Sequence, residues 1–281
     1  MPYSEHPVFQ TRSNKKIWRY ISIPQLLSII EKNSLWFTRS DRFDDPYEGR
    51  LPKNQEILED SSGIRLPEWA EIKQHMGRKN RGTANWEPVN EVSEIEAYRR
   101  ISFVNSWHQQ EEELDTLWRA NLNTPFGAAI KSSTEKMKNS FSQCDQHDVY
   151  IGEVNYIDFD DDSIPERNRL YPFIYKRMGF SQENEIRAVV TSLPHKDHPE
   201  WKGRVPGERV SLEWNNQPPG MYIDIDVNML VEEVRISPTT SDWVKDTLSD
   251  IISKYGLDIQ IEYSSLAAGL GQYSMGRNDV Y

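Results

Sequence analysis

The pattern of apolar and polar residues predicts short strands mixed with amphipathic helices. Alternating or β-branched stretches predict strands at 17–22, 35–39, 100–108, 127–133, 149–160, 220–227 and 257–265. Apolar residues spaced three and four apart predict helices at 22–33, 111–122, 133–141 and 240–255. Because strands and helices alternate irregularly, we expect an α+β fold with a mixed, mostly antiparallel sheet flanked by helices.

Local signals mark the ends of two of these helices. Ser22 and Gln25 form a capping-box pair at the start of the first helix, with Pro24 in its first turn. The helix at 240–255 is closed by Gly256. We expect its apolar face to consist of Trp243, Val244, Leu248, Ile251, Ile252 and Tyr255.

The distribution of apolar residues predicts a single domain over 1–281 that carries an insertion. Residues 51–98 contain few apolar side chains and are expected to form a peripheral insertion. The stretch 194–219 is rich in Pro and Gly and predicts a loop. Residues 267–281 include the glycine-containing "GLGQYSMG" without a strand–loop–helix context, so we expect a mobile tail.

Charge and cysteine content restrict the class of protein. The net charge of −11 argues against general coating of nucleic acid, although "KQHMGRKNRG" is locally basic. The chain has one cysteine, Cys144, which favours a reducing compartment. No apolar run is long enough to span a membrane, and the first residues do not resemble a signal peptide. We therefore expect a cytoplasmic protein.

The stretch "FSQENEIRAVV" places charges at every second position of an otherwise apolar strand. Alternate residues of a strand share a face, so Glu183, Glu185 and Arg187 are expected opposite the core residues. Charges of this kind often protect a solvent-exposed edge strand. The preceding "YKRMGF" adds rings and cations, and this mixture favours the wall of a binding cleft instead.

Several stretches together carry a family resemblance. They are "WRYISIPQLLSIIEKNSLWFTRSDRFDDPYEG", "ISFVNSW", "LWRANLNTPFGAAI", "YKRMGFSQENEIRAVV" and the ending "VRISPTTSDWVKDTLSDIISKYGLDIQIEYSSL". In them the chain resembles the bacterial family called domain of unknown function 2971, across most of its length outside 51–98 and the extreme C-terminus. It departs from that family at Asp44, where Asn is usual, at Ile186, where an aromatic residue is usual, and at "WRAN".

The order of these motifs is also similar to the Arg–Ser–Glu arrangement of ADP-ribosyltransferases. This resemblance implies NAD as the substrate and a cleft of the transferase type. Arg19 would hold the diphosphate or ribose, because a guanidinium matches phosphate oxygens. Ser102, or alternatively Ser106, would support the nicotinamide-ribose pocket. The remaining cofactor-binding candidates are Tyr20, Tyr47, Lys176 and Arg187.

The same resemblance implies the catalytic residues. Glu185 would accept a hydrogen bond from the ribose 2′-hydroxyl, and its charge would stabilise the oxocarbenium-like state as nicotinamide leaves. Glu183 would activate or orient the acceptor, an unidentified macromolecule. The implied protein is an NAD-dependent ADP-ribosyltransferase-like enzyme, of the kind found among bacterial toxins and phage-defence proteins.

Two other functions remain open at this point. One is a non-catalytic module that binds a small molecule or a protein through the same residues. The other is a metal-dependent nuclease, in which Asp44, Asp45 and Glu48 join Glu183 and Glu185. The strand lacks the Glu-x-Lys pair that such nucleases carry, and only "HKDH" has ligand-like histidine spacing, so we expect no metal.

Overall fold

Contacts group the chain into two compact units. The computed structural model describes residues 3–4, 6–7, 9–11, 14–53, 55, 77–79, 86–88, 94–121, 126–144, 147–165, 170–192, 218–237 and 240–266. Unit 1 consists of Met1–Arg12, Leu35–Ser106 and Phe141–Ile223, and unit 2 of Ser13–Ser34, Trp107–Ser140 and Asp224–Tyr281. The residue pattern, which predicts a single domain, carries no sign of this division.

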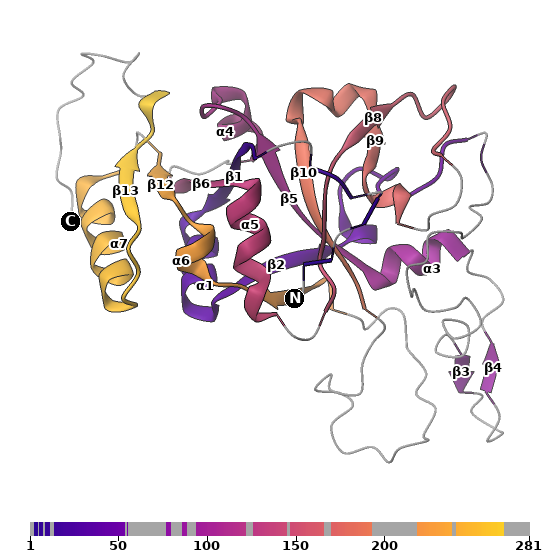
Figure 1. Ribbon diagram of the computed structural model, residues 1–281, viewed down its shortest axis with the longest axis horizontal. Coiled ribbons are helices and arrows are strands. Elements are labelled where there is room, and N and C mark those ends of the chain that lie inside the picture. Colours follow the sequence, from indigo (N-terminus) through magenta and orange to yellow (C-terminus); the bar gives the residue numbers. More distant parts are fainter. Residues whose placement is uncertain are drawn as a thin grey trace. The chain divides into compact units, whose positions relative to one another are not determined.

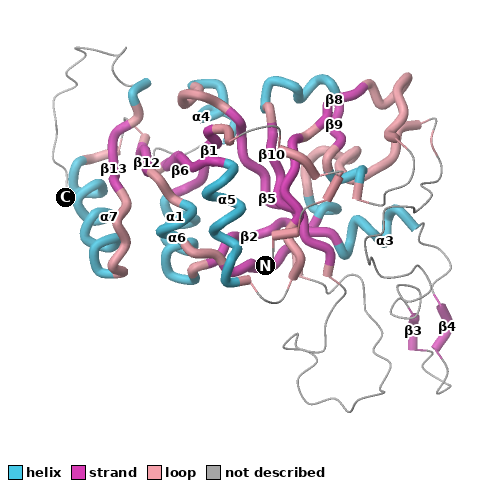
Figure 2. Tube along the Cα trace, viewed as in Figure 1, coloured by secondary structure: helices cyan, strands magenta, loops and turns pink. Residues whose placement is uncertain are grey.

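The fold is α+β, as predicted. Most described strands belong to a large, mixed, mostly antiparallel open sheet, with helices beside it (Figures 1 and 2). Two further pairs of strands form small sheets of their own. Within the described residues, no helix is long and apolar enough to cross a membrane.

The strands of unit 1 surround β5. Strand β2 pairs antiparallel with β5 and neighbours β11, while β10 pairs with β5 and, antiparallel, with β7. The small sheets are the parallel pair β8–β9 and the antiparallel pair β3–β4. The bounds are β2 Ser34–Arg39, β3 Gly77–Lys79, β4 Trp86–Pro88, β5 Ser102–Gln109, β7 Tyr150–Glu153, β8 Asn155–Ile157, β9 Tyr175–Arg177, β10 Glu185–Thr191 and β11 Gly220–Asp224.

Within the described part of unit 1, helical turns and helix α3 complete the fold. They are η1 Ser40–Arg42, α3 Glu94–Ile101, η2 Phe141–Gln143, η3 Tyr171–Phe173 and η4 Met178–Glu183. The core of this unit contains Phe9, Tyr98, Ile101, Val104, Tyr150, Leu170, Phe173, Ile174 and Val189. Tyr98 is buried there, so the core begins inside the segment 51–98 that the sequence predicts to be peripheral. Most of that segment lies outside the described residues.

Unit 2 continues from the end of β5. Strand β1 pairs antiparallel with β5 and β6, β6 pairs antiparallel with β12, and β12 pairs parallel with β13. The strands are β1 Lys16–Ser22, β6 Gly127–Ser133, β12 Glu233–Ile236 and β13 Gln260–Tyr263. The helices are α1 Ile23–Lys32, α4 Asp115–Asn121, α5 Thr134–Ser140, α6 Val227–Leu230 and α7 Asp242–Lys254.

The capping box that the sequence predicts is present at the start of α1. The Ser22 side chain accepts from the Gln25 backbone, and the Gln25 side chain accepts from the Ser22 backbone N–H at 2.8 Å. The predicted apolar face of α7 is only partly right. Val244, Leu248 and Ile252 are buried, whereas Trp243 is 66 % exposed and Tyr255 47 %. The helix therefore buries a narrower stripe than its sequence suggests.

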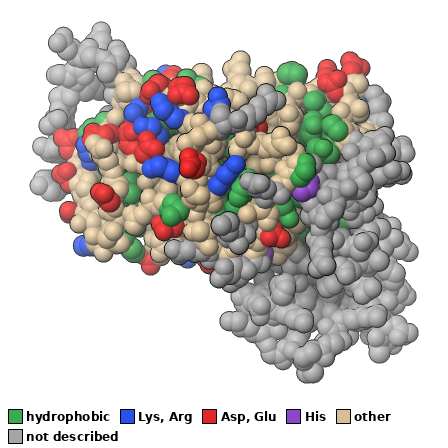
Figure 3. All heavy atoms as spheres, in the orientation of Figure 1, with side chains coloured by type: hydrophobic (Ala, Val, Ile, Leu, Met, Phe, Trp, Pro, Cys, Tyr) green, Lys and Arg blue, Asp and Glu red, His purple; other side chains and the backbone are tan. Residues whose placement is uncertain are grey.

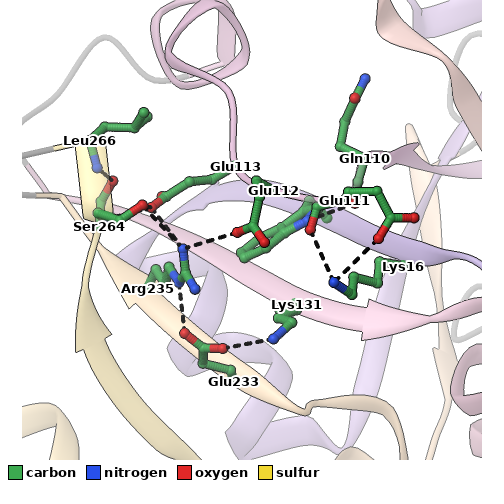
Figure 4. Close-up of polar contacts among 12 residues, drawn as sticks. Lys16, Gln110, Glu111, Glu112, Glu113, Lys131, Glu233, Arg235, Ser264 and Leu266 are labelled. Atoms are coloured by element: carbon green, nitrogen blue, oxygen red, sulfur yellow. Dashed lines mark hydrogen bonds and ion pairs between the residues drawn. The ribbon is translucent and has the colours of Figure 1, made fainter.

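The run Glu111–Glu113 differs from the expected first turn of a helix, because α4 begins only at Asp115. Two of these carboxylates form ion pairs instead. Glu111 pairs with Lys16 at 3.3 Å, and buried Glu113 accepts from Arg235 Nη1 at 2.9 Å (Figure 4). Arg235 also bonds Glu233, and Lys131 pairs with the same carboxylate. Acidic and basic side chains are likewise interspersed on the face shown in Figure 3.

The remaining regions predicted from the sequence have different outcomes. The stretch 149–160 is neither one long strand nor a hairpin, because β7 pairs with β10 and β8 pairs with β9. The expected loop at 194–219 falls almost wholly outside the described residues. The "HKDH" histidines, the basic "KQHMGRKNRG" apart from three strand residues, and the expected tail 267–281 also lie outside them.

Candidate functional site

Unit 1 contains a cluster of buried charges centred on β10. Glu185 and Arg187 are 3 % and 0 % exposed, and Arg187 Nε donates to Glu185 Oε2 at 2.6 Å. The residues between and after them, Ile186 and Ala188, are also fully buried. Both faces of β10 are therefore covered, and the alternative that its charges protect a solvent-exposed edge strand is wrong. We call Glu48, Lys176, Glu183, Glu185 and Arg187 the charge cluster.

Glu48 is the second counter-ion of Arg187. The two guanidinium Nη atoms donate to the two carboxylate oxygens of Glu48, and Nη1 also donates to the carbonyl of Phe173 at 2.8 Å. Arg99 Nε donates to the Glu48 carbonyl at 2.8 Å, which fixes the turn that carries this residue. Four of the five N–H groups of Arg187 thus donate to described protein groups, and the side chain is fully buried, so a direct contact with a cofactor would require the surrounding chain to move.

The next residue, Gly49, explains the end of the "DDPYEG" turn. Its φ is +68°, in the left-handed region that glycine tolerates best, and a Cβ there would lie 2.8 Å from the Phe173 ring. A larger residue would therefore push apart the turn and the segment whose carbonyl accepts from Arg187.

Lys176 joins the two glutamates of the cluster. Its Nζ donates to Glu183 Oε2 at 2.6 Å and also to Glu185 Oε1. Lys176 is 10 % exposed and Glu183 31 %, so the glutamate pair is exposed chiefly through Glu183. Both oxygens of Glu185 are engaged, one by Lys176 and the other by Arg187.

Glu183 reaches this position by a route that strand alternation does not describe. It is the last residue of the turn η4, and β10 begins only at Glu185. Between them, Asn184 adopts a left-handed conformation with φ of 42°. Asn tolerates this region better than other non-glycine residues do. The sequence correctly places the two carboxylates near each other, but for the wrong local reason.

The environment separates the acidities of the two glutamates. Burial, together with a hydrogen bond to Glu185, raises the pKa of Glu183 to about 7. Burial alone would also raise the pKa of Glu185, but the charge of Arg187, with Glu183 and Lys176 nearby, holds it well below its usual range. At neutral pH Glu185 is therefore ionised, whereas Glu183 is close to its midpoint. Separated acidities of this kind are found in paired catalytic carboxylates.

The net charge of the charge cluster also indicates that it holds one proton. When every group is ionised, the three carboxylates of the charge cluster face two cations, which leaves one negative charge. A net charge in a buried cluster is costly, because little water is available to solvate it. One proton on the cluster removes the imbalance, and the most exposed carboxylate, Glu183, is the one most accessible to it.

The two candidate serines lie on β5 in different surroundings. Both hydroxyl oxygens are buried and have no hydrogen-bond partner among the described residues. Ser102 is 0 % exposed, whereas Ser106 is partly exposed although its neighbours on β5 are buried. An unsatisfied buried hydroxyl is uncommon in a folded protein and calls for a partner.

The pairing of β5 with β10 separates Ser102 from Glu185. The Ser192 N–H donates to the Ile101 carbonyl at 2.8 Å, so the end of β10 lies beside the start of β5. Glu185 is at the other end of β10, about 20 Å away at the usual rise per residue. Within unit 1, Ser106 is therefore the closer of the two serines to the charge cluster.

Arg19 and Tyr20 belong to β1 in unit 2. Arg19 Nη1 is buried, and this side chain has no hydrogen bond or ion pair with any described residue. Its guanidinium lies 5.9 Å from the centre of the Trp107 ring. Burial lowers the pKa of Arg19 to about 10. Tyr20, in contrast, is engaged by the protein, because its hydroxyl accepts from the Leu114 N–H at 3.0 Å.

Tyr47 lies beside a second cation of unit 1. The Arg177 guanidinium is 4.6 Å from the Tyr47 ring and 5.2 Å from the Phe180 ring, and it pairs with Asp45 at 2.8 Å. Asp45 Oδ1 also accepts from the Tyr47 N–H, as expected for an Asx turn. No group of three or more His, Cys, Asp or Glu in the described residues is arranged to hold a metal ion.

Sequence reasoning missed the part that Glu48 and Tyr156 play here. Glu48 was considered only as a possible metal ligand, and it is 139 residues from Arg187 in the sequence, so no local pattern links the two. Tyr156 contacts Glu185 through a side chain–backbone hydrogen bond of 2.8 Å. The fold shows the need for a partner, because Glu48 is buried and a buried carboxylate requires a cation, but its position in the sequence after the "DPY" turn does not.

Comparison with family models, curated proteins and solved structures found no match for the chain. The resemblance to domain of unknown function 2971 and to ADP-ribosyltransferases therefore stays a prediction.

Proposed function

We propose that the chain is an NAD-dependent ADP-ribosyltransferase-like enzyme, of the class that includes bacterial toxins and phage-defence proteins. The observation that carries this proposal is the pair Glu183–Glu185, which shares Lys176 and whose two pKa values are moved in opposite directions. One carboxylate is thereby kept ionised and the other is poised to exchange a proton at neutral pH. This is the division of labour that glycosyl transfer requires.

In the proposed reaction the bond between C1′ of the nicotinamide ribose and the ring nitrogen breaks. Its electron pair goes to the nitrogen, so nicotinamide leaves as a neutral molecule. The ionised Glu185 stabilises the positive charge that develops on the ribose. A nucleophile of the acceptor then forms the new bond to C1′, and Glu183 takes the proton that the nucleophile loses.

Unsatisfied polar atoms support the binding of an additional molecule. Ser106 carries a buried hydroxyl without a described partner and is the closer of the two serines to the charge cluster of unit 1. Arg19, in unit 2, carries a buried guanidinium nitrogen without a described hydrogen-bond partner, and phosphate oxygens are the group that a guanidinium of this kind binds. Lys176 and Arg187 contribute by fixing the carboxylates, since Lys176 donates to Glu183 and Glu185, and Arg187 donates to Glu185 and Glu48.

One observation favours a second candidate, a non-catalytic binding module. Glu185 is 3 % exposed and both of its oxygens are engaged by cations. A carboxylate in this state can hold a fold together without touching a substrate. In that case the charge cluster would be structural, and a ligand would contact Glu183, Ser106 or both.

Nicotinamide release from labelled NAD, with a cell lysate as the source of acceptor, tests the proposal. Wild-type protein is expected to release nicotinamide, and Glu183→Gln is expected to lose transfer to the acceptor. Glu232→Gln is the matched control, because Glu232 is also a carboxylate paired with a lysine, Lys131, but lies in unit 2. If NAD neither raises the Tm of the wild type nor is cleaved, the binding module is the better reading.

A further inference from the structure

Tyr156 is placed at the charge cluster by the small sheet β8–β9. Its Cα pairs with that of Lys176 across the two parallel strands, so the two side chains share a face of the sheet. Lys176 is the cation that bridges Glu183 and Glu185. The side chain of Tyr156 is partly buried, and its hydroxyl lies 2.8 Å from the backbone nitrogen of Glu185.

The hydroxyl of Tyr156 uses only part of its bonding capacity. It accepts the Glu185 N–H, and its own proton is donated to no described residue. Burial raises the pKa of Tyr156, so the hydroxyl stays protonated at neutral pH and remains a donor. A tyrosine hydroxyl can accept and donate at the same time. The site therefore contains a neutral donor, fixed in position by the backbone of Glu185, beside carboxylates that can only accept while ionised.

We propose that Tyr156 is a further ligand-binding residue of this site. Its hydroxyl donates a hydrogen bond to a hydroxyl or carbonyl oxygen of the nicotinamide riboside half of NAD. This inference rests on the proposed function, because it takes NAD as the ligand. The donor complements its surroundings. Glu183 and Glu185 can bind the hydroxyl protons of a sugar. The two cations offer little to an oxygen that needs to accept a hydrogen bond, because Arg187 is fully buried and Lys176 is 10 % exposed, with two of its three N–H groups engaged by these carboxylates.

Tyr156→Phe tests this proposal, because it removes the hydroxyl and keeps the ring. The matched control is Tyr175→Phe. Tyr175 lies on the neighbouring strand β9, is partly buried, and pairs with Asn155, the residue before Tyr156. Steady-state nicotinamide release by the full chain is measured against NAD concentration. We expect Tyr156→Phe to raise KM for NAD roughly three- to tenfold, the loss of one neutral hydrogen bond, with kcat within about twofold. Tyr175→Phe should change neither.

The alternative role of Tyr156 is to position Glu185 through its backbone, and it gives a different result. In that case Tyr156→Phe lowers kcat and leaves KM unchanged, as Glu185→Gln would, and the proposal is overturned. It is also overturned if Tyr156→Phe and Tyr175→Phe behave alike in an active enzyme. A wild type that neither binds nor cleaves NAD contradicts both the proposed function and this inference. An active wild type whose KM does not rise in Tyr156→Phe contradicts this inference alone, so the two failures are distinguishable.

Discussion

Arg187 and Glu48 form a buried, doubly hydrogen-bonded ion pair that links strand β10 to the "DDPYEG" turn. The guanidinium and the carboxylate are 0 % and 1 % exposed. A planar guanidinium and a carboxylate match each other in this geometry, and neither group has solvent to replace a lost partner.

Glu48→Ala is expected to lower the free energy of unfolding by about 3–5 kcal/mol, because it leaves a buried guanidinium short of a counter-ion. Urea unfolding measures this change. The control is Glu111→Ala, whose pair with Lys16 is exposed and should contribute about 0–1 kcal/mol. Equal effects of the two substitutions would show that the charge cluster does not hold unit 1 together.

Glu185→Gln is expected to reduce nicotinamide release by about 10²-fold or more, since it removes the charge that faces the developing cation. Because Glu185 is buried between Lys176 and Arg187, the same change should also cost roughly 1–3 kcal/mol of stability. Activity is therefore compared at a temperature where urea or thermal unfolding shows the variant to be folded. A folded variant with wild-type turnover would remove Glu185 from the mechanism.

The raised pKa of Glu183 predicts a pH dependence of stability. The folded state holds the proton up to about pH 7, whereas an unperturbed glutamate releases it near 4.5. Between these values the folded state binds more protons than the unfolded state, so this contribution to stability is complete below pH 4.5 and is lost as the pH rises through 7. The difference in unfolding free energy between wild type and Glu183→Gln, measured from pH 4.5 to 8, should fall with increasing pH. A flat difference would contradict the assignment.

Substitutions of the two serines are expected to have different effects, one on NAD binding and the other on stability. Ser106→Ala should weaken NAD binding, with KM raised roughly three- to tenfold, because it removes the hydroxyl that the proposal makes available to the ligand. Ser102→Ala removes a fully buried hydroxyl without a described partner, so the protein should be unchanged or more stable by about 1 kcal/mol, with KM for NAD unaffected. Thermal unfolding and steady-state kinetics of both variants check this. An effect of Ser102→Ala on KM would restore Ser102 as the cofactor-binding serine.

Arg19 provides a test in which stability and binding change in opposite directions. Arg19→Met keeps an apolar side chain beside Trp107 and removes a guanidinium without a described partner, so unfolding without NAD should become harder by about 1 kcal/mol. The rise in Tm that NAD produces should shrink. Arg119→Met is the control, since Arg119 forms an exposed pair with Asp115. A loss of stability in Arg19→Met would indicate a structural role instead.

Features that depend on residues close together in the sequence were predicted correctly, whereas features that depend on contacts between distant segments were not. The α1 capping box joins residues three apart, Ser22 and Gln25, and the sequence predicts it correctly. The exposure of Trp243 could not be predicted, because periodicity shows which residues share a helix face but not how much of that face a neighbour covers. The α+β class followed from the order of the elements alone, without any knowledge of pairing.

At the candidate site, too, the sequence identifies neighbouring residues but not their contacts with distant segments. The motif "ENEIR" contains three members of the charge cluster, and the sequence identifies all of them. The burial of Glu185 and Arg187 was missed, since alternation predicts two faces but cannot tell that both are covered. Glu48 and Tyr156 come from distant segments, and only the folded chain brings them to Arg187 and Glu185.

The left-handed Asn184 also bears on how relatives of this protein can be found. If the spacing of the two glutamates depends on that conformation, the middle residue of Glu-x-Glu is under selection for its backbone and not for its side chain. Asn, Asp or Gly would keep the two carboxylates on the same lysine, whereas a β-branched residue would favour an unbroken strand and redirect Glu183. A search profile that weights this middle position would separate chains that share the arrangement from those that only share two glutamates.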